Sequence, residues 1–216
     1  MRRSNGVLFM KNIDLRLRVN GQAKEWSIAP GDLLLDVLRR EGYFGVKRGC
    51  EKGECGACTV LVNGKAINSC LMFAAQAEGS DVLTIEGLAQ GDVLHPLQEA
   101  FLDLGAVQCG FCTGGMILSA KALLDRNPDP TVEEVREVMA GNYCRCTGYE
   151  KPVEAVLAAA VVARAFVPAA STVVSTFGAS PHNSQAGHHS ANPRSAPKSK
   201  KTDDKKRSSV LLGGQR

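Results

Sequence analysis

The sequence predicts an α+β protein with a strand-rich first half and a helical second half. Up to about residue 88, short segments alternate apolar and polar residues and are joined by Asn-Gly turns, which is typical of half-buried strands in hairpins. Beyond it, apolar residues recur at the spacing of helices that bury one face. We predict a first domain over 9–88, a second over 89–166, and a disordered tail over 167–216.

The strands of the first half are expected in hairpins. Asn20-Gly21 and Asn63-Gly64 mark the two tight turns. Between the hairpins, Asp32 is expected to cap a short helix that carries three apolar residues at helical spacing. Strands are predicted over 15–19, 59–62, 65–71 and 82–85, and the return strand of the first hairpin is continued by Trp26 and Ile28.

Four helices are predicted in the second half, which suggests a small bundle. The first begins at Pro96, and the second covers about 115–126. Thr131 and Glu134 form a capping-box pattern ahead of the third, and Pro152 opens the fourth.

The basic charge of the chain is confined to its end. The whole chain of 216 residues has a formal net charge of +4. Residues 167–216 contain eight Lys or Arg and two Asp, so they carry +6, and the first 166 residues carry −2. The predicted folded part is therefore not a basic nucleic-acid binder. The tail has lost aliphatic periodicity and is expected to be disordered, either as a solvated segment or as a contact for an acidic partner.

A cytoplasmic location is predicted from the start of the sequence. Met1-Arg2-Arg3 is followed by only a short apolar run before charged residues resume, whereas a secretion signal needs about 7–15 apolar residues. A twin-arginine export signal is the alternative. No stretch reaches the roughly 18 apolar residues of a membrane helix, so no membrane association is expected.

Eight cysteines form two sets of four. Disulfides are disfavoured by the chain length and the predicted cytoplasmic setting. Cysteines with close, regular spacing in such a protein favour metal or cluster binding. The first set is Cys50, Cys55, Cys58 and Cys70, and the second is Cys109, Cys112, Cys144 and Cys146.

The first set has the spacing of a plant-type [2Fe–2S] site. Cys50, Cys55 and Cys58 follow the pattern C-x4-C-x2-C, and Cys70 lies further along the chain. Each of the two irons needs two thiolates, so a short loop must wrap the cluster and a fourth ligand must come from elsewhere. Glycines threaded through the loop allow positive φ angles and let amides point at an anionic cluster.

The second set favours an iron–sulfur site over zinc. It reads C-x2-C, then C-x-C, and zinc sites more often use paired C-x2-C units. Cys109 and Cys112 precede one predicted helix, and Cys144 and Cys146 follow another. The positive end of a helix dipole suits an anionic cluster.

Three motifs together give a family resemblance. They are Gly49 to Cys58, Gln108-Cys109-Gly110-Phe111-Cys112-Thr113, and Asn142-Tyr143-Cys144-Arg145-Cys146-Thr147-Gly148-Tyr149. With them, the chain resembles the iron–sulfur subunit of the xanthine dehydrogenase/aldehyde oxidoreductase family of molybdenum hydroxylases over about residues 10–165. Gly114 stands where that family usually has proline.

The resemblance implies a β-grasp, ferredoxin-like domain, a four-helix-bundle domain, and one [2Fe–2S] cluster in each. It implies that all eight cysteines are ligands and that Gln108 contacts the pterin of a molybdenum cofactor. That cofactor is expected on a large partner subunit and FAD on a medium one, in a dimer of heterotrimers. The chain would carry electrons and no catalytic residue of its own, and the substrate would be selected in a partner.

Two other classes of protein stay open from the residues alone. One is a free-standing electron carrier, although an ordinary ferredoxin needs no helical domain with a second cysteine set. The other is a zinc-binding structural protein, which would be colourless.

Overall fold

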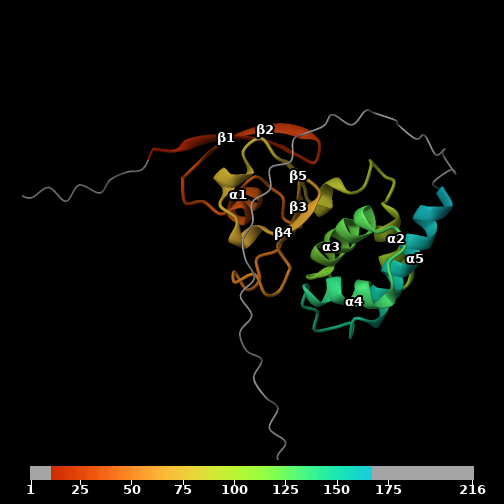
Figure 1. Ribbon diagram of the computed structural model, residues 1–216. Helices are drawn as coiled ribbons and strands as arrows, with labels where there is room; N and C mark the ends of the chain where they lie inside the picture. Colours follow the sequence, from red (N-terminus) through yellow and green to blue (C-terminus); the bar gives the residue numbers. More distant parts are fainter. Residues whose placement is uncertain (1–10, 167–216) are drawn as a thin grey trace, which may run out of the picture. The chain divides into compact units, whose positions relative to one another are not determined.

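The computed structural model describes residues 11–166, with side chains to residue 162 (Figure 1). The predictions for the first ten residues and for the tail over 167–216 lie outside this range. The first half contains a five-stranded mixed sheet in the order β2-β1-β5-β3-β4. Strands β1 and β5 are parallel, and the other neighbours are antiparallel. The strands are β1 (Ile13–Val19), β2 (Gln22–Ile28), β3 (Thr59–Val62), β4 (Lys65–Asn68) and β5 (Asp81–Leu83).

The first hairpin forms as predicted. Leu15, Leu17 and Val19 are buried on one face of β1, while the residues between them are exposed. Asn20 and Gly21 have φ angles of 52° and 76°, the left-handed pair that a tight hairpin turn requires. The alternation of the sequence therefore determines which face of this strand packs on the core.

The expected cap of the first helix is wrong. Helix α1 (Leu34–Arg40) has Leu33 as its N-cap, and its first turn has no side-chain cap. The Asp32 carboxylate instead accepts hydrogen bonds from the Ala29 amide and the Arg40 side chain, each at 3.1 Å. The helix is held by burial: its four apolar residues are covered and share one core with the sheet.

The second hairpin is shorter than predicted. Strand β4 ends at Asn68, and the chain then turns into the 3-10 helix η1 (Ser69–Leu71), so Cys70 lies in this turn rather than in the strand. Two more 3-10 helices, η2 (Ala74–Ala77) and η3 (Ile85–Gly87), flank β5. Strand β5 likewise stops at Leu83, two residues before the predicted end.

The second half contains helices α2 (Pro96–Asp103), α3 (Thr113–Arg126), α4 (Val132–Ala140) and α5 (Glu150–Phe166). The capping box forms as expected, with Thr131 Oγ1 accepting from the Glu134 amide and the Glu134 carboxylate accepting from the Thr131 amide. Helix α5 begins at Glu150, so Pro152 lies in its first turn rather than opening it.

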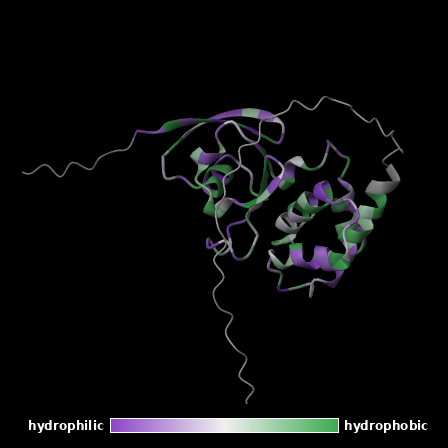
Figure 2. Cartoon of the chain, viewed as in Figure 1, coloured by the Kyte–Doolittle hydropathy of each residue, from purple (hydrophilic) through white to green (hydrophobic). Residues whose placement is uncertain are grey.

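Residues from all four helices share a second core. Phe101 of α2, Met116 of α3, Met139 of α4 and Val156 of α5 are almost completely buried in it. In Figure 2, the coloured part of α5 is mainly hydrophobic, whereas α4 shows hydrophilic residues along one side. None of the helices among the described residues is long and apolar enough to cross a membrane.

Helix α3 connects the two halves. It packs against α4 and α2 in the second half and also against β3 and β4 of the sheet. The loops that carry the two cysteine sets lie next to this contact, as the hydrogen bonds described below show.

Candidate iron–sulfur sites

The first cysteine set is carried by the loop between α1 and β3 and by η1. Cys50 and Cys55 are partly exposed on the loop, and Cys58 and Cys70 are buried. Glu51, Gly53 and Gly56 have φ angles of 55°, 79° and 64°, so the loop turns back on itself repeatedly. This turning brings backbone amides toward the sulfurs.

Three backbone amides converge on one sulfur. Those of Lys52, Glu54 and Cys55 donate to Cys50 Sγ at 3.4, 3.3 and 3.4 Å. The Cys50 amide in turn donates to Cys55 Sγ at 3.4 Å. The Lys52 amide and then the Cys55 amide lower the pKa of Cys50 to about 6. The loop thus stabilises negative charge on sulfur, as a thiolate ligand of a cluster requires.

Cys58 and Cys70 form the buried side of this set. Burial raises the pKa of Cys58 to about 11, and the neighbouring Cys70 thiol contributes to the same shift. The Ser69 hydroxyl donates to the Cys58 carbonyl at 2.7 Å, which fixes η1 against the end of the loop. Cys58 and Cys70 therefore face each other although they come from different elements.

The second set lies between the ends of two helices, as predicted. Cys112 is the N-cap residue of α3 and is buried with Cys144, which follows α4. Burial and the neighbouring Cys144 raise the pKa of Cys112 to about 12. Cys109 and Cys146 are exposed, and the Cys109 thiol raises the pKa of Cys146. Cys112 and Cys144 are thus covered by the protein, whereas Cys109 and Cys146 are exposed at its surface.

A turn after Cys144 wraps back onto its sulfur. The Thr147 hydroxyl lies 3.2 Å from Cys144 Sγ, and the Tyr149 hydroxyl accepts from the Cys144 amide at 2.7 Å. Gly148 and Tyr149 both have positive φ, which is rare for tyrosine. Burial acts to raise the pKa of Cys144, but hydrogen bonds from Thr147 and Cys146 outweigh it and lower this pKa to about 7.

Three residues contact the cysteine-bearing loops although their sequence pattern predicted no role for them: Asn142, Thr147 and Tyr149. All three lie in the third motif, and the short Thr-Gly-Tyr run directly after Cys-x-Cys was the available signal. Gln108 is exposed in the loop between α2 and α3, beside Cys109.

The donor set suits iron–sulfur clusters. In the first set, three converging amides stabilise negative charge on Cys50 Sγ. Gly49 has no side chain to displace the Cys55 sulfur, since a Cβ atom there would lie 2.7 Å from it. Within each set the thiols form two interacting pairs, and each iron of a [2Fe–2S] cluster takes two thiolates. The pairs are Cys50 with Cys55, Cys58 with Cys70, Cys112 with Cys144, and Cys109 with Cys146. Within residues 11–166, no three His, Cys, Asp or Glu side chains converge as ligands of a single metal ion.

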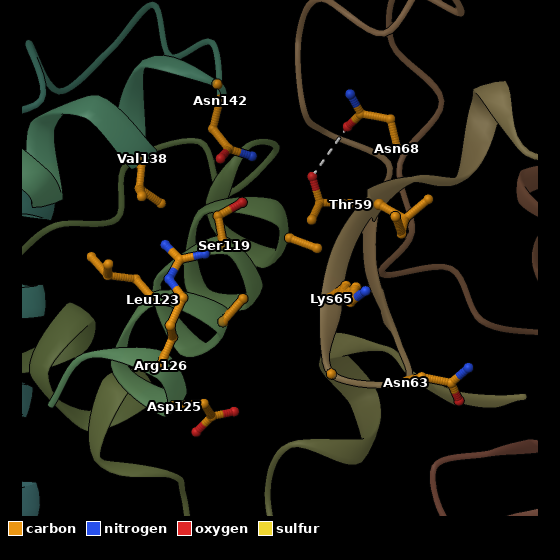
Figure 3. Close-up of a pocket in the computed structure, with 15 residues that line it drawn as sticks. Thr59, Asn63, Lys65, Asn68, Ser119, Leu123, Asp125, Arg126, Val138 and Asn142 are labelled. Atoms are coloured by element: carbon orange, nitrogen blue, oxygen red, sulfur yellow. Dashed lines mark hydrogen bonds between the residues drawn. The ribbon is translucent and has the colours of Figure 1, made fainter. Parts of the chain in front are cut away.

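An open groove of about 770 Å³ lies between the second hairpin and helices α3 and α4 (Figure 3). Asn68 and Lys65 line it from the strand side, and Leu123, Arg126 and Asn142 line it from the helical side. The groove contains none of the eight cysteines. Its end at Asn142 adjoins the contact between the two cysteine-bearing loops.

Comparison with known proteins identifies the family. Residues 17–93 match the family described as a 2Fe-2S iron-sulfur cluster binding domain, and residues 84–157 match the [2Fe-2S] binding domain family. The chain is 53% identical over 143 residues to the nicotinate dehydrogenase small FeS subunit of Eubacterium barkeri, covering 66% of this chain and 91% of that protein. The chain belongs to the iron–sulfur subunits of the xanthine dehydrogenase/aldehyde oxidoreductase family of molybdenum hydroxylases.

Two further relatives agree with this. The subunit is 48% identical to the xanthine dehydrogenase iron-sulfur-binding subunit of Escherichia coli O157:H7, over 68% of this chain and 94% of that protein. Its fold matches a chain of quinoline 2-oxidoreductase from Pseudomonas putida 86 with a TM-score of 0.69 at 45% identity, over 72% of this chain and 98% of that one. The mixed sheet and its helix therefore belong to a ferredoxin-like 2Fe–2S fold.

The family matches indicate how many clusters the subunit binds. The two matched domains fit two [2Fe–2S] clusters on this iron–sulfur subunit of an oxidoreductase complex. The relatives are small subunits of multi-subunit enzymes, which implies a large molybdenum-binding partner for this one.

Proposed function

We propose that this subunit passes single electrons from the molybdenum cofactor of its partner, through two [2Fe–2S] clusters, to FAD or another acceptor. One-electron transfer is the chemistry that the clusters supply when bound. The observation that carries the proposal is the presence of two four-cysteine sets, each with amides or hydroxyls directed at its sulfurs, on loops that contact each other. The chain's own residues bind the clusters and hold them close together.

The eight cysteines are proposed as the ligands, four to each cluster. In this proposal α2 to α5 are the bundle that holds the second cluster, and the domains divide at about residues 88 and 89. Cys109 and Cys146 would form the outward side of that cluster, toward the molybdenum-binding partner. Gln108, exposed beside Cys109, would contact the pterin there.

The complete assembly is proposed to include a medium FAD-binding subunit, as a dimer of heterotrimers in the cytoplasm. The FAD subunit and the dimer are what the family resemblance implies, and FAD can accept electrons one at a time. No catalytic residue is assigned to the subunit itself.

Purification of the native complex tests the function. We expect about four irons per copy of this subunit and two distinct [2Fe–2S] signals in electron paramagnetic resonance (EPR) spectra of the reduced protein. Molybdenum and a pterin should purify with it. Zinc in place of iron would contradict cluster binding, and two clusters without molybdenum would indicate a free-standing electron carrier.

The Thr147 hydroxyl is expected to raise the reduction potential of the second cluster. A hydrogen bond to a ligand sulfur stabilises the extra negative charge of the reduced state. Thr147→Val removes the hydroxyl and keeps the shape, so the potential should fall. A hydrogen bond that is about 1 kcal/mol stronger in the reduced state than in the oxidised state corresponds to about 40 mV for one electron.

A redox titration followed by EPR measures this shift. Thr147→Ser is the matched control because it retains the hydroxyl, and its potential should stay near that of the unmodified protein. Equal potentials in the valine and serine variants would argue against the hydrogen bond as the cause.

A further inference from the structure

The two cysteine-bearing loops are joined by hydrogen bonds across the two halves of the fold. The Tyr143 amide donates to the Cys55 carbonyl at 2.8 Å. Next to it, Asn142 Nδ2 donates to the Gly56 carbonyl at 3.0 Å. Consecutive residues of one loop therefore bind consecutive residues of the other.

Asn142 is held inside this contact. Asn142 is only 1% exposed, and its backbone amide donates to the Met139 carbonyl at the end of α4. The Gly56 carbonyl that it binds also accepts from the amide and the hydroxyl of Thr59, at 3.1 and 2.7 Å. Because Asn142 is buried, separation of the loops would leave its side-chain amide without this acceptor, whereas the Gly56 carbonyl would keep its bonds from Thr59. The cost of that unpaired amide favours the one geometry in which the loops stay in contact.

Glycines allow the two loops to approach this closely. A Cβ atom at Gly56 would lie within 3.0 Å of the Gly141 carbonyl oxygen and of Asn142 Nδ2, and one at Gly115 would lie within 3.0 Å of the Gly56 carbonyl oxygen. The first loop, the start of α3 and the segment after α4 therefore meet backbone to backbone. Such a contact has little freedom to shift without breaking its hydrogen bonds.

This contact also provides a short bonded connection between proposed ligands of the two clusters. Cys55 belongs to the first set, and Tyr143 directly precedes Cys144 of the second. A single hydrogen bond, from the Tyr143 amide to the Cys55 carbonyl, is the only non-covalent link along this connection. Electron tunnelling is faster along covalent and hydrogen bonds than across gaps between atoms, so the position of this bond affects the transfer rate.

We propose that Asn142 is a positioning residue that holds the Cys55–Tyr143 hydrogen bond in place and thereby sets the electronic coupling between the two clusters. The proposal rests on the proposed electron-transfer function. Asn142 contacts neither set of sulfurs in any hydrogen bond of the described residues, so it acts through the backbone of the two loops.

The chain offers a matched control for this residue. Asn68 Nδ2 also donates to a glycine carbonyl of the first loop, that of Gly53, at 3.0 Å. Asn68 lies on β4, in the same half as the loop, so its bond does not connect the halves. Figure 3 shows the two asparagines on opposite sides of the groove.

The test compares Asn142→Ala, Asn142→Asp and Asn68→Ala in the purified complex. Two measurements are made: the magnetic splitting of the EPR signals when both clusters are reduced, and the rate of electron transfer between the clusters after rapid reduction. We expect both Asn142 variants to keep their iron, to show weaker splitting and to transfer electrons at least about ten-fold more slowly. Asn68→Ala should keep the splitting and the rate of the unmodified complex.

Three results would overturn the proposal. One is unchanged splitting and rate in the iron-loaded Asn142 variants. Another is an equal loss in Asn68→Ala, because the effect would not then depend on the link between the halves. The third is loss of a cluster from both Asn142 variants, which would make Asn142 a determinant of cluster assembly instead. If the unmodified complex itself lacked cluster signals, the proposed function would fail rather than this inference alone.

Discussion

Replacing Cys144 with serine is expected to remove the second cluster and stop electron flow through the subunit. Cys144 is buried at the contact of α3 with the segment after α4, paired with Cys112. Iron–sulfur clusters select soft thiolate ligands, and a serine hydroxyl at this position is a hard and weakly acidic replacement. Turnover of the complex should fall at least about 100-fold. This is a larger loss than is typical when a residue that only hydrogen-bonds to a metal ligand is replaced.

Iron analysis and EPR check this result without relying on turnover. The Cys144→Ser subunit should contain about two irons instead of four and retain only the plant-type signal. Cys70→Ser is the reciprocal variant and should retain only the other signal. Full turnover of the Cys144→Ser complex with an acceptor that accepts electrons after the first cluster would contradict the proposed order of transfer.

Gly115→Ala is expected to cause the largest loss of stability among conservative changes in α3. A methyl group at Gly115 would meet the Gly56 backbone carbonyl, which cannot move aside as a side chain can. Overpacking of this kind costs about 1–3 kcal/mol, and here it also strains the contact between the two loops. We expect a decrease of about 2 kcal/mol in the free energy of unfolding, seen as a lower midpoint in thermal or denaturant unfolding.

The neighbouring glycine supplies the control. At Gly114 a Cβ atom would lie 3.3 Å from a methyl group of Ile85, which has side-chain freedom to adjust. The gain in helix propensity from glycine to alanine, up to about 1 kcal/mol, should offset that contact. Gly114→Ala should therefore be close to neutral, and an equal loss in both variants would show that helix α3, rather than the loop contact, is responsible.

The local patterns of the sequence predicted the elements well where one face is buried. The alternation in β1 and the Asn20-Gly21 turn gave the first hairpin correctly, because a strand with period-two burial has only one favourable register. The Thr131 capping box was also found, since its partners are three residues apart. The Asp32 cap was wrong because the carboxylate accepts instead from the Ala29 amide and the Arg40 side chain, which helix-start rules do not consider.

In the candidate site, too, the features set by local spacing were predicted and those set by distant contacts were not. Cysteine spacing predicted the first cluster site, because a loop that wraps a cluster fixes the distances between its ligands along the chain. At the second set the spacing only favoured iron–sulfur over zinc, and the family resemblance implied the second cluster. Asn142 and Thr147 received no role, since their importance depends on partners that lie far along the chain or on a turn with positive φ. Burial and hydrogen bonding of single side chains are set by the packed structure.

By itself the sequence determined the family, the α+β order of elements and the two sets of four cysteines, because each depends on short-range spacing. The tertiary structure alone decided that the two sets lie on loops in direct contact, with Asn142 and Tyr143 bonded to Gly56 and Cys55. These partners are more than 80 residues apart in the sequence. Their contact arises because α3 packs on β3 and glycines let backbone meet backbone, which only the assembled core can bring about.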